Sequence, residues 1–464
     1  MRMCKETSDN RGLVAAIFFL LGMGTLLPWN FFITAMNYFT ERLKTGNEAN
    51  PGNGSNPEQA DPYMFGNLSV LLAQLPLLLF TLLNSFLYQH IAEKIRIGGS
   101  MVFILLLFIL TASLVKVEMD RDHFFYITMA TIWFINMFGA VLQGSLFGLV
   151  GKLPPRYSSL FMSGQAVAGI FSGLAMLLSN IFETDSESSA LGYFITPCAA
   201  TLLTLCCYLI LPNLKFARLH LENGFSESEE TRKEPLTNIS ATESVTLVKV
   251  KLNDDNGLDI NGKMILTASD SEACKKVDEL KQEAPEEKSS VPQVFKKIWV
   301  MALCVTCTFA VTLSVFPAIT INTQPSGLFE GKKNIFVPFC SFIVFNVMDW
   351  IGRSLTSRLQ LPSMKSCFFP IFVVLRVIFI PALMLCNVHP RSVLPVIFNH
   401  DVAYMVIMSL FAMTNGYFAC LSMSYAPQLV KPKDAETAGA LMTFFLAVGL
   451  SLGAALSFAL KQII

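Results

Sequence analysis

The chain has 464 residues, of which 53% are hydrophobic and 15% charged, and its formal net charge at pH 7 is zero. A soluble protein carries about a quarter charged residues, so this composition indicates a polytopic membrane protein and gives no sign of nucleic-acid binding. The five histidines lack the spacing of metal ligands, and most of the cysteines lie in apolar segments. We therefore expect no metal, no cofactor and no disulfide framework.

Eleven apolar runs are long enough to cross a bilayer, and the first is too long for a signal-peptide core. We expect an all-α fold with six membrane helices in residues 1–212 and five in residues 298–464. Between them, residues 213–297 are hydrophilic with almost no aromatics, which is typical of a disordered linker. In chain order, the runs cover 13–39, 66–90, 98–117, 124–150, 159–182, 190–212, 298–322, 334–357, 367–387, 402–429 and 437–461.

Basic residues in the short loops gather on one side of the expected membrane, among them Arg96, Lys152 and Lys431. The positive-inside rule makes that side the cytosol. An odd number of spans then puts the N-terminus in the cytosol and the C-terminus outside. The first outer loop contains Asn53-Gly-Ser55, a glycosylation acceptor on the side where glycosylation occurs.

The two halves share a faint repeat. Pro28 in the first run and Pro317 in the seventh are expected to break their helices. An amide followed by glycine occurs at Gln143-Gly144 in the fourth run and at Asn415-Gly416 in the tenth. Breaks at corresponding positions in two halves are typical of a transporter with a central binding site.

The eighth run carries Asp349 and Arg353, which are four residues apart and so share one helix face. Phe342, Phe345 and Asn346 extend the same stripe. Ionisable residues inside a membrane usually face a polar cavity or another helix. We interpret the stripe as the wall of a pathway for a small polar solute; the alternative is a buried ion pair that fixes helix packing.

Asp349 is the only acidic residue expected deep in a span, and Arg353 is its expected counter-charge. A carrier driven by ions needs a carboxylate free to bind its ion or proton, so we expect no obligatory coupling ion.

Arg376 in the ninth run has no acid in its own helix. We expect it to reach the membrane interface or the ends of helices rather than to contact the solute.

The candidate lining combines flat aromatic faces with amide donors and acceptors; its further members are Trp29, Phe316, Asn30, Gln143 and Gln165. Such a set suits a planar ring joined to a sugar, and a hexose or an aromatic amino acid fits nearly as well. Each amide can instead join two helices, and Trp29 can instead anchor the chain at the interface. An enzyme is disfavoured because no nucleophile elbow or phosphate-binding loop is found; a receptor that does not transport remains a rival.

Several stretches resemble the equilibrative nucleoside transporter family. They are Gly22–Phe32, Gln143–Gly148, Phe345–Arg353, Thr414–Tyr417 and Glu436–Ala440. The resemblance implies an eleven-helix, major-facilitator-like fold in the plasma membrane. It also implies sodium-independent facilitated diffusion of purine and pyrimidine nucleosides and of some nucleobases.

Carried onto matching positions, the resemblance implies that Asp349 and Arg353 meet the ribose and that Gln143 meets the base. The other implied lining residues are Leu26, Trp29, Phe316, Phe342, Asn346, Leu77 and Leu450.

Three positions bear on inhibitor sensitivity, and they disagree. Ile33 and Gln74 stand where the nitrobenzylthioinosine-sensitive member has methionine, whereas Gly139 matches that member. The stretches Gln74–Pro76 and Tyr193–Pro197 are shared with one vertebrate branch of the family.

Overall fold

The computed structural model describes residues 12–35, 38–39, 42–43, 65–87, 91–117, 119–181, 186–214, 217–218, 289–391 and 393–464. By their contacts, Met1–Arg218 and Ser290–Ile464 group into one unit. Asn53 and most of the expected linker lie outside the described residues. The described chain is almost entirely helical, with two isolated β-bridges.

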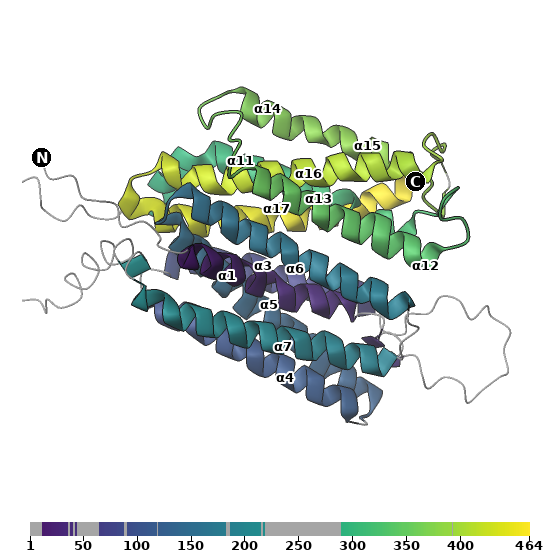
Figure 1. Ribbon diagram of the computed structural model, residues 1–464, viewed down its shortest axis with the longest axis horizontal. Coiled ribbons are helices and arrows are strands. Elements are labelled where there is room, and N and C mark those ends of the chain that lie inside the picture. The colour runs from purple at the N-terminus through teal and green to yellow at the C-terminus, as the bar shows by residue number, and fades with distance from the viewer. Residues whose placement is uncertain are drawn as a thin grey trace, which may run out of the picture. The chain divides into compact units, whose positions relative to one another are not determined.

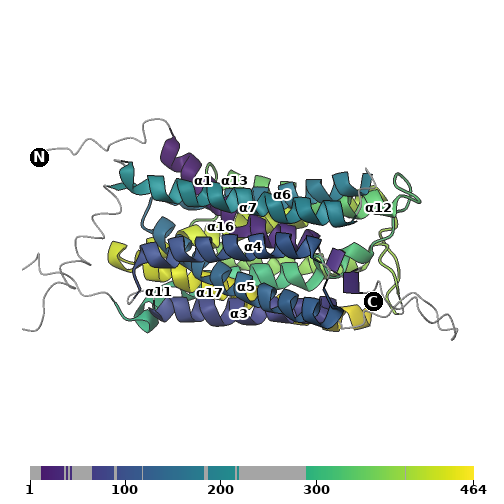
Figure 2. The same cartoon turned by 90° about the horizontal axis from the view of Figure 1, so that it is seen from below.

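The helices run roughly parallel or antiparallel to one another (Figure 1 and Figure 2). The first half contains α1 (Leu13–Thr34), α3 (Phe65–Leu87), η1 (Ile95–Gly99), α4 (Ser100–Lys116), α5 (Arg121–Gly151), α6 (Pro155–Ile181), α7 (Ser186–Ile210) and η2 (Leu211–Asn213). The second half contains α11 (Val291–Val315), η4 (Thr320–Asn322), α12 (Lys333–Phe336), η5 (Val337–Ile343), α13 (Val344–Leu355), α14 (Phe368–Leu375), η6 (Arg376–Ile378), α15 (Phe379–Met384), α16 (Asp401–Tyr425), η7 (Ala426–Leu429), η8 (Pro432–Asp434) and α17 (Ala435–Ile463).

Within the described residues, nine helices are long and apolar enough to cross a membrane. Two shorter apolar helices, Leu72–Phe86 and Phe368–Met384, lie where the second and ninth spans were expected. The all-helical membrane fold is therefore confirmed, while the count of eleven spans stays a prediction.

The two expected proline breaks differ. α11 ends at Val315, several residues before the expected end, and Phe316 is extended at φ −105° and ψ 133°. A residue that precedes proline is pushed out of the helical region by the proline ring, which explains this end. α1 instead continues through Pro28 to Thr34, so a proline ends the helix in only one of the two places.

Two seams join the halves. Within the first half, α1 packs against α6 and α7; within the second, α13 packs against α16 and α11 against α17. Across the halves, α6 packs against α13 and η5, and α17 packs against α3 and α5. The functional division into six and five helices stays a prediction.

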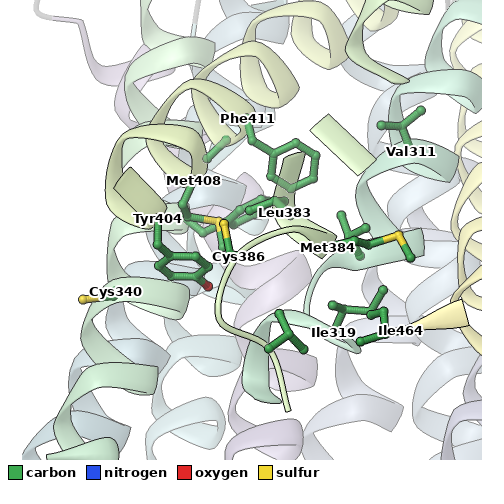
Figure 3. Close-up of a cluster of buried hydrophobic side chains, with 14 of the residues drawn as sticks. Val311, Ile319, Cys340, Leu383, Met384, Cys386, Tyr404, Met408, Phe411 and Ile464 are labelled. Carbon is green, nitrogen blue, oxygen red and sulfur yellow. The ribbon is translucent and has the colours of Figure 1, made fainter. Parts of the chain in front are cut away.

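The buried apolar cluster of the second half holds the ends of these helices together. Tyr404, Met408 and Phe411 on α16 turn toward Leu383 and Cys386 beside α15 (Figure 3). The hydroxyls of Tyr404 and Ser341 lie 2.7 Å apart, so the polar end of the Tyr404 ring is hydrogen-bonded. This packing fixes α16, which carries a polar residue of the site described next.

Candidate functional site

The charged pair expected on the eighth span is present on α13. Asp349 is 3% exposed and Arg353 is 6% exposed. Arg353 Nε donates to Asp349 Oδ2 at 2.7 Å, as the four-residue spacing predicted. A charge-assisted bond of this length in a buried place is among the strong hydrogen bonds of a protein.

The second oxygen of Asp349 is bonded from α16. Asn415 Nδ2 donates to Asp349 Oδ1 at 2.7 Å. α16 reaches α13 because Gly416 has no side chain: a Cβ there would lie 2.0 Å from the Asp349 carbonyl oxygen. The amide–glycine pair of the tenth span therefore brings two helices together and holds the carboxylate.

Arg353 extends the site across the seam to the first half. Its Nη1 donates to the Met162 carbonyl of α6 at 3.1 Å and to Gln165 Oε1 at 3.5 Å. Gln165 Nε2 in turn donates to the Thr25 hydroxyl of α1 at 3.2 Å. Gln165, which the sequence suggested as a lining amide, is thus bonded to protein at both ends.

The Gln143 amide of α5 contrasts with these bonded amides. Gln143 is 8% exposed, and among the described residues its amide forms no hydrogen bond with protein. No Gln143 atom is among the fully buried side-chain atoms that lack a partner, so its amide keeps some exposure and is available to a bound solute. Leu26, Leu77 and Leu450, from α1, α3 and α17, are partly buried.

The aromatic residues pack more on one another than the sequence suggested. Phe316 stacks on Phe345 with centroids 3.9 Å apart and meets Phe342 edge-on at 5.6 Å. Phe345 is 7% exposed and also packs on Phe411, so the expectation that it offers a free face is wrong. Phe316 and Phe342 are only partly buried.

Trp29 and Asn346 also have protein neighbours. The Trp29 ring lies parallel to Phe32, with centroids 5.9 Å apart. Asn346 Nδ2 donates to the Phe342 carbonyl at 2.8 Å, and its Oδ1 faces Gly169 of α6 so closely that a Cβ there would lie 2.0 Å away. Asn346 therefore lies at the seam between the halves.

Arg376 was expected to reach the membrane interface or the ends of helices, and both expectations are wrong: it is buried among residues in the interior of α11 and α16. It is among the largest fully buried side chains. Its Nη1 donates to the Thr308 carbonyl at 2.8 Å and its Nη2 to the Thr312 hydroxyl at 3.0 Å. Arg376 is the first residue of the 3₁₀ turn η6, and these oxygens take the place of water around its guanidinium.

The inhibitor-related positions are spread over the fold. Ile33 is 42% exposed. Gln74 Oε1 accepts from the Ser451 hydroxyl of α17 at 3.3 Å. Nothing lies within 4 Å of a Cβ built at Gly139, so that position has room for a side chain.

Among the described residues, no group of three His, Cys, Asp or Glu side chains could hold a metal.

A second charged cluster, which sequence reasoning missed, bridges the halves at the other seam. Glu436 on α17 lies 3.1 Å from Arg96 Nη2 and 2.9 Å from Lys152 Nζ. Lys152 also lies 3.5 Å from Glu93. The sequence carries a signal for this cluster: Arg96, Lys152 and Glu436 all lie at the ends of expected spans on the same predicted side of the membrane.

Burial and neighbouring charges act in opposite directions on the pKa values of Glu93 and Lys152, which lie outside the apolar spans. Burial raises the pKa of the Glu93 carboxyl, and the neighbouring Lys152 charge lowers it by less. Burial also acts to lower the pKa of Lys152, but the Glu436 and Glu93 carboxylates together raise it above its ordinary value. Lys152 is therefore held as a cation between two carboxyl groups.

The chain is similar to known membrane transporters. The family model described as nucleoside transporter matches residues 129–462. The chain is 49% identical over 462 residues to Equilibrative nucleoside transporter 2 of Homo sapiens, covering 98% of each chain. It is 42% identical to Equilibrative nucleoside transporter 1 of Rattus norvegicus, covering all of each chain.

The fold is also found in a solved structure. The major facilitator superfamily proton:xylose symporter XylE matches with a TM-score of 0.57 and 12% identity, over 98% of this chain and 89% of that one. This likeness confirms the major-facilitator-like fold. The family matches in turn confirm the resemblance found in the motifs, including the branch indicated by Gln74–Pro76 and Tyr193–Pro197. The chain belongs to the nucleoside transporter family.

Proposed function

We propose that this chain carries purine and pyrimidine nucleosides across a membrane by facilitated diffusion. The observation that carries the proposal is the buried Asp349–Arg353 pair, which lies where α13 meets α16 and α6. The relatives are named as equilibrative nucleoside transporters, so an enzyme is disfavoured.

The solute contacts follow from the donors and acceptors that remain. Asp349 accepts one bond at each oxygen, so further lone pairs are left for the vicinal hydroxyls of a ribose. The unbonded Gln143 amide is suited to the base, and Phe316 and Phe342 to its flat faces. The remaining proposed lining residues are Leu26, Trp29, Asn346, Leu77 and Leu450.

Transport without a coupling ion is supported by the same bonds. Arg353 lies 2.7 Å from Asp349 and balances its charge, so the carboxylate does not need a proton or a sodium ion as its counter-charge. We extend the proposal to some nucleobases, because the Gln143 contact requires no ribose.

The proposed mechanism is alternating access between residues 1–212 and 298–464, with 213–297 as a cytosolic linker. It is supported by the two seams, because polar bonds such as Arg353 to Met162 and Glu436 to Arg96 can break and re-form as the halves rock. The proposed site of action is the plasma membrane, with the N-terminus in the cytosol and the C-terminus outside.

The test is uridine uptake into liposomes that contain the purified protein, with and without sodium and a pH gradient. Asp349→Ala and Arg353→Ala are run beside the wild type. We expect saturable uptake that needs neither gradient and is lost in both variants. No uridine uptake by well-folded wild type rejects the function, and uptake that demands sodium or protons rejects the mechanism. Competition with a hexose separates the remaining rival solute.

A further inference from the structure

Arg376 is a buried cation that the proposed solute contacts do not use. Among the described residues it forms no ion pair; its donors go to hydroxyl and carbonyl oxygens. Its ring neighbour, Phe411, lies 5.5 Å from the guanidinium carbon. Burying an unpaired charge is costly. The groups that Arg376 contacts therefore indicate whether this cation has a role beyond helix packing.

A continuous chain of hydrogen bonds leads from Arg376 to Asp349. Arg376 Nη2 donates to Thr312 Oγ1 at 3.0 Å, and the Thr312 hydroxyl donates to Asn415 Oδ1 at 2.7 Å. Asn415 Nδ2 then donates to Asp349 Oδ1 at 2.7 Å. Thr312 and Asn415 are each 2% exposed, so no bulk water competes for these bonds.

The direction of these bonds is set by the two ends. A guanidinium can only donate and an ionised carboxylate can only accept. The Asn415 amide must therefore turn its N–H toward Asp349 and its oxygen toward Thr312. The Thr312 hydroxyl also lies 2.8 Å from the Thr308 carbonyl, but that oxygen already accepts from Arg376, whereas Asn415 Oδ1 has no other donor among the described residues.

We propose that Arg376 is a positioning residue for the solute: through Thr312 and Asn415 it fixes Asp349 Oδ1, the carboxylate oxygen not held by Arg353, for the vicinal hydroxyls of the ribose. This inference rests on the proposed function. Arg353 fixes only Oδ2, and on its own it leaves the carboxylate free to rotate about its last bond. The relay from η6 and α11 through α16 sets that rotation, and so sets the recognition of the sugar.

The sharpest variant is Thr312→Val, which keeps the shape of the side chain and removes the hydroxyl that links Arg376 to Asn415. Thr312→Ser restores the hydroxyl. The matched control is Thr111→Val in α4, because Thr111 is also buried and its hydroxyl donates to the carbonyl four residues earlier, Leu107, at 2.8 Å. Arg376→Lys and Arg376→Met follow as a second series.

The readout is the KM and the maximal rate of uridine uptake in liposomes, together with the inhibition constant of 2′,3′-dideoxyuridine, which lacks both hydroxyls. For Thr312→Val we expect the KM for uridine to rise about five-fold, as for one lost hydrogen bond. The inhibition constant of the dideoxy analogue and the maximal rate should stay within two-fold. Thr312→Ser and Thr111→Val should behave as wild type.

The outcomes are separable. An unchanged uridine KM in Thr312→Val, or an equal rise for uridine and the dideoxy analogue, overturns the positioning role. Arg376→Met should repeat the Thr312→Val pattern; if it fails to fold, the Thr312 pair still decides. A wild type that takes up uridine but does not distinguish it from the dideoxy analogue also overturns the inference. A wild type with no uridine uptake overturns the proposed function instead.

Discussion

Neutralising Glu436 should loosen the seam between α17 and α5. Glu436 is the only one of the four residues in its cluster that belongs to the second half, and it accepts from both Arg96 and Lys152. Removing one partner of a buried ion pair costs about 3–5 kcal/mol. The Lys152 side chain is 17% exposed, so we take the lower value, about 3 kcal/mol.

Under alternating access this cost falls only on the state in which the seam is closed. About 3 kcal/mol changes the ratio of closed to open molecules by about two orders of magnitude. In Glu436→Gln, amide exchange with deuterium should therefore rise at the end of α5 and at the start of α17. The maximal rate of uridine uptake should change as well, because the population of one end state of the cycle has shifted.

Glu93→Gln is the matched control. Glu93 lies in the same cluster, but its contact is with Lys152 of its own half, at 3.5 Å. The substitution removes a carboxylate without removing a link between the halves, so exchange at both helix ends should match the wild type. Equal exchange in the Glu436 and Glu93 variants would refute the reasoning that Glu436 links the halves.

Three further predictions concern separate parts of the molecule. Arg353→Lys keeps the charge but loses the Nη1 bonds to α6, and uridine uptake in liposomes should fall more than ten-fold, close to Asp349→Asn; near-normal uptake would contradict the assigned geometry. Gly416→Ala should lower surface expression and melting temperature, because its Cβ would lie 2.0 Å from a backbone oxygen, whereas Gly139→Ala, with nothing within 4 Å, should leave both unchanged. The pKa of Glu93 is raised by burial, so its contribution to stability is full below the unfolded pKa and is lost as pH rises through the folded one. The melting temperature should therefore fall over that window in wild type and fall less in Glu93→Gln.

The sequence predicted the helices better than their ends and partners. The apolar run at 334–357 became the continuous segment Lys333–Leu355, and the four-residue spacing on it gave the Asp349–Arg353 bond. Periodicity carries this information because both partners lie on one helix. It carries none for Arg376, whose partners come from α11 and α16, so only the packing of three helices shows where its donors go.

The two charged clusters differ in composition, and the difference matches their places in the fold. The cluster around Glu436 joins two cations with two carboxylates across the halves, so its charges balance while the seam is closed. When the halves separate, Glu436 leaves as an anion and its former partners keep one surplus positive charge, and water must then solvate both sides. The cluster around Asp349 joins two guanidiniums to one carboxylate, mostly within the second half, and hydroxyls and amides complete it. The surplus positive charge of Arg353 and Arg376 is thus held by hydroxyl and amide groups that stay in place. Such an arrangement suits a site that keeps its shape while a solute enters and leaves. Substitutions around Glu436 should therefore act on the rate of the cycle, and substitutions along the Asp349 relay on which solute is bound.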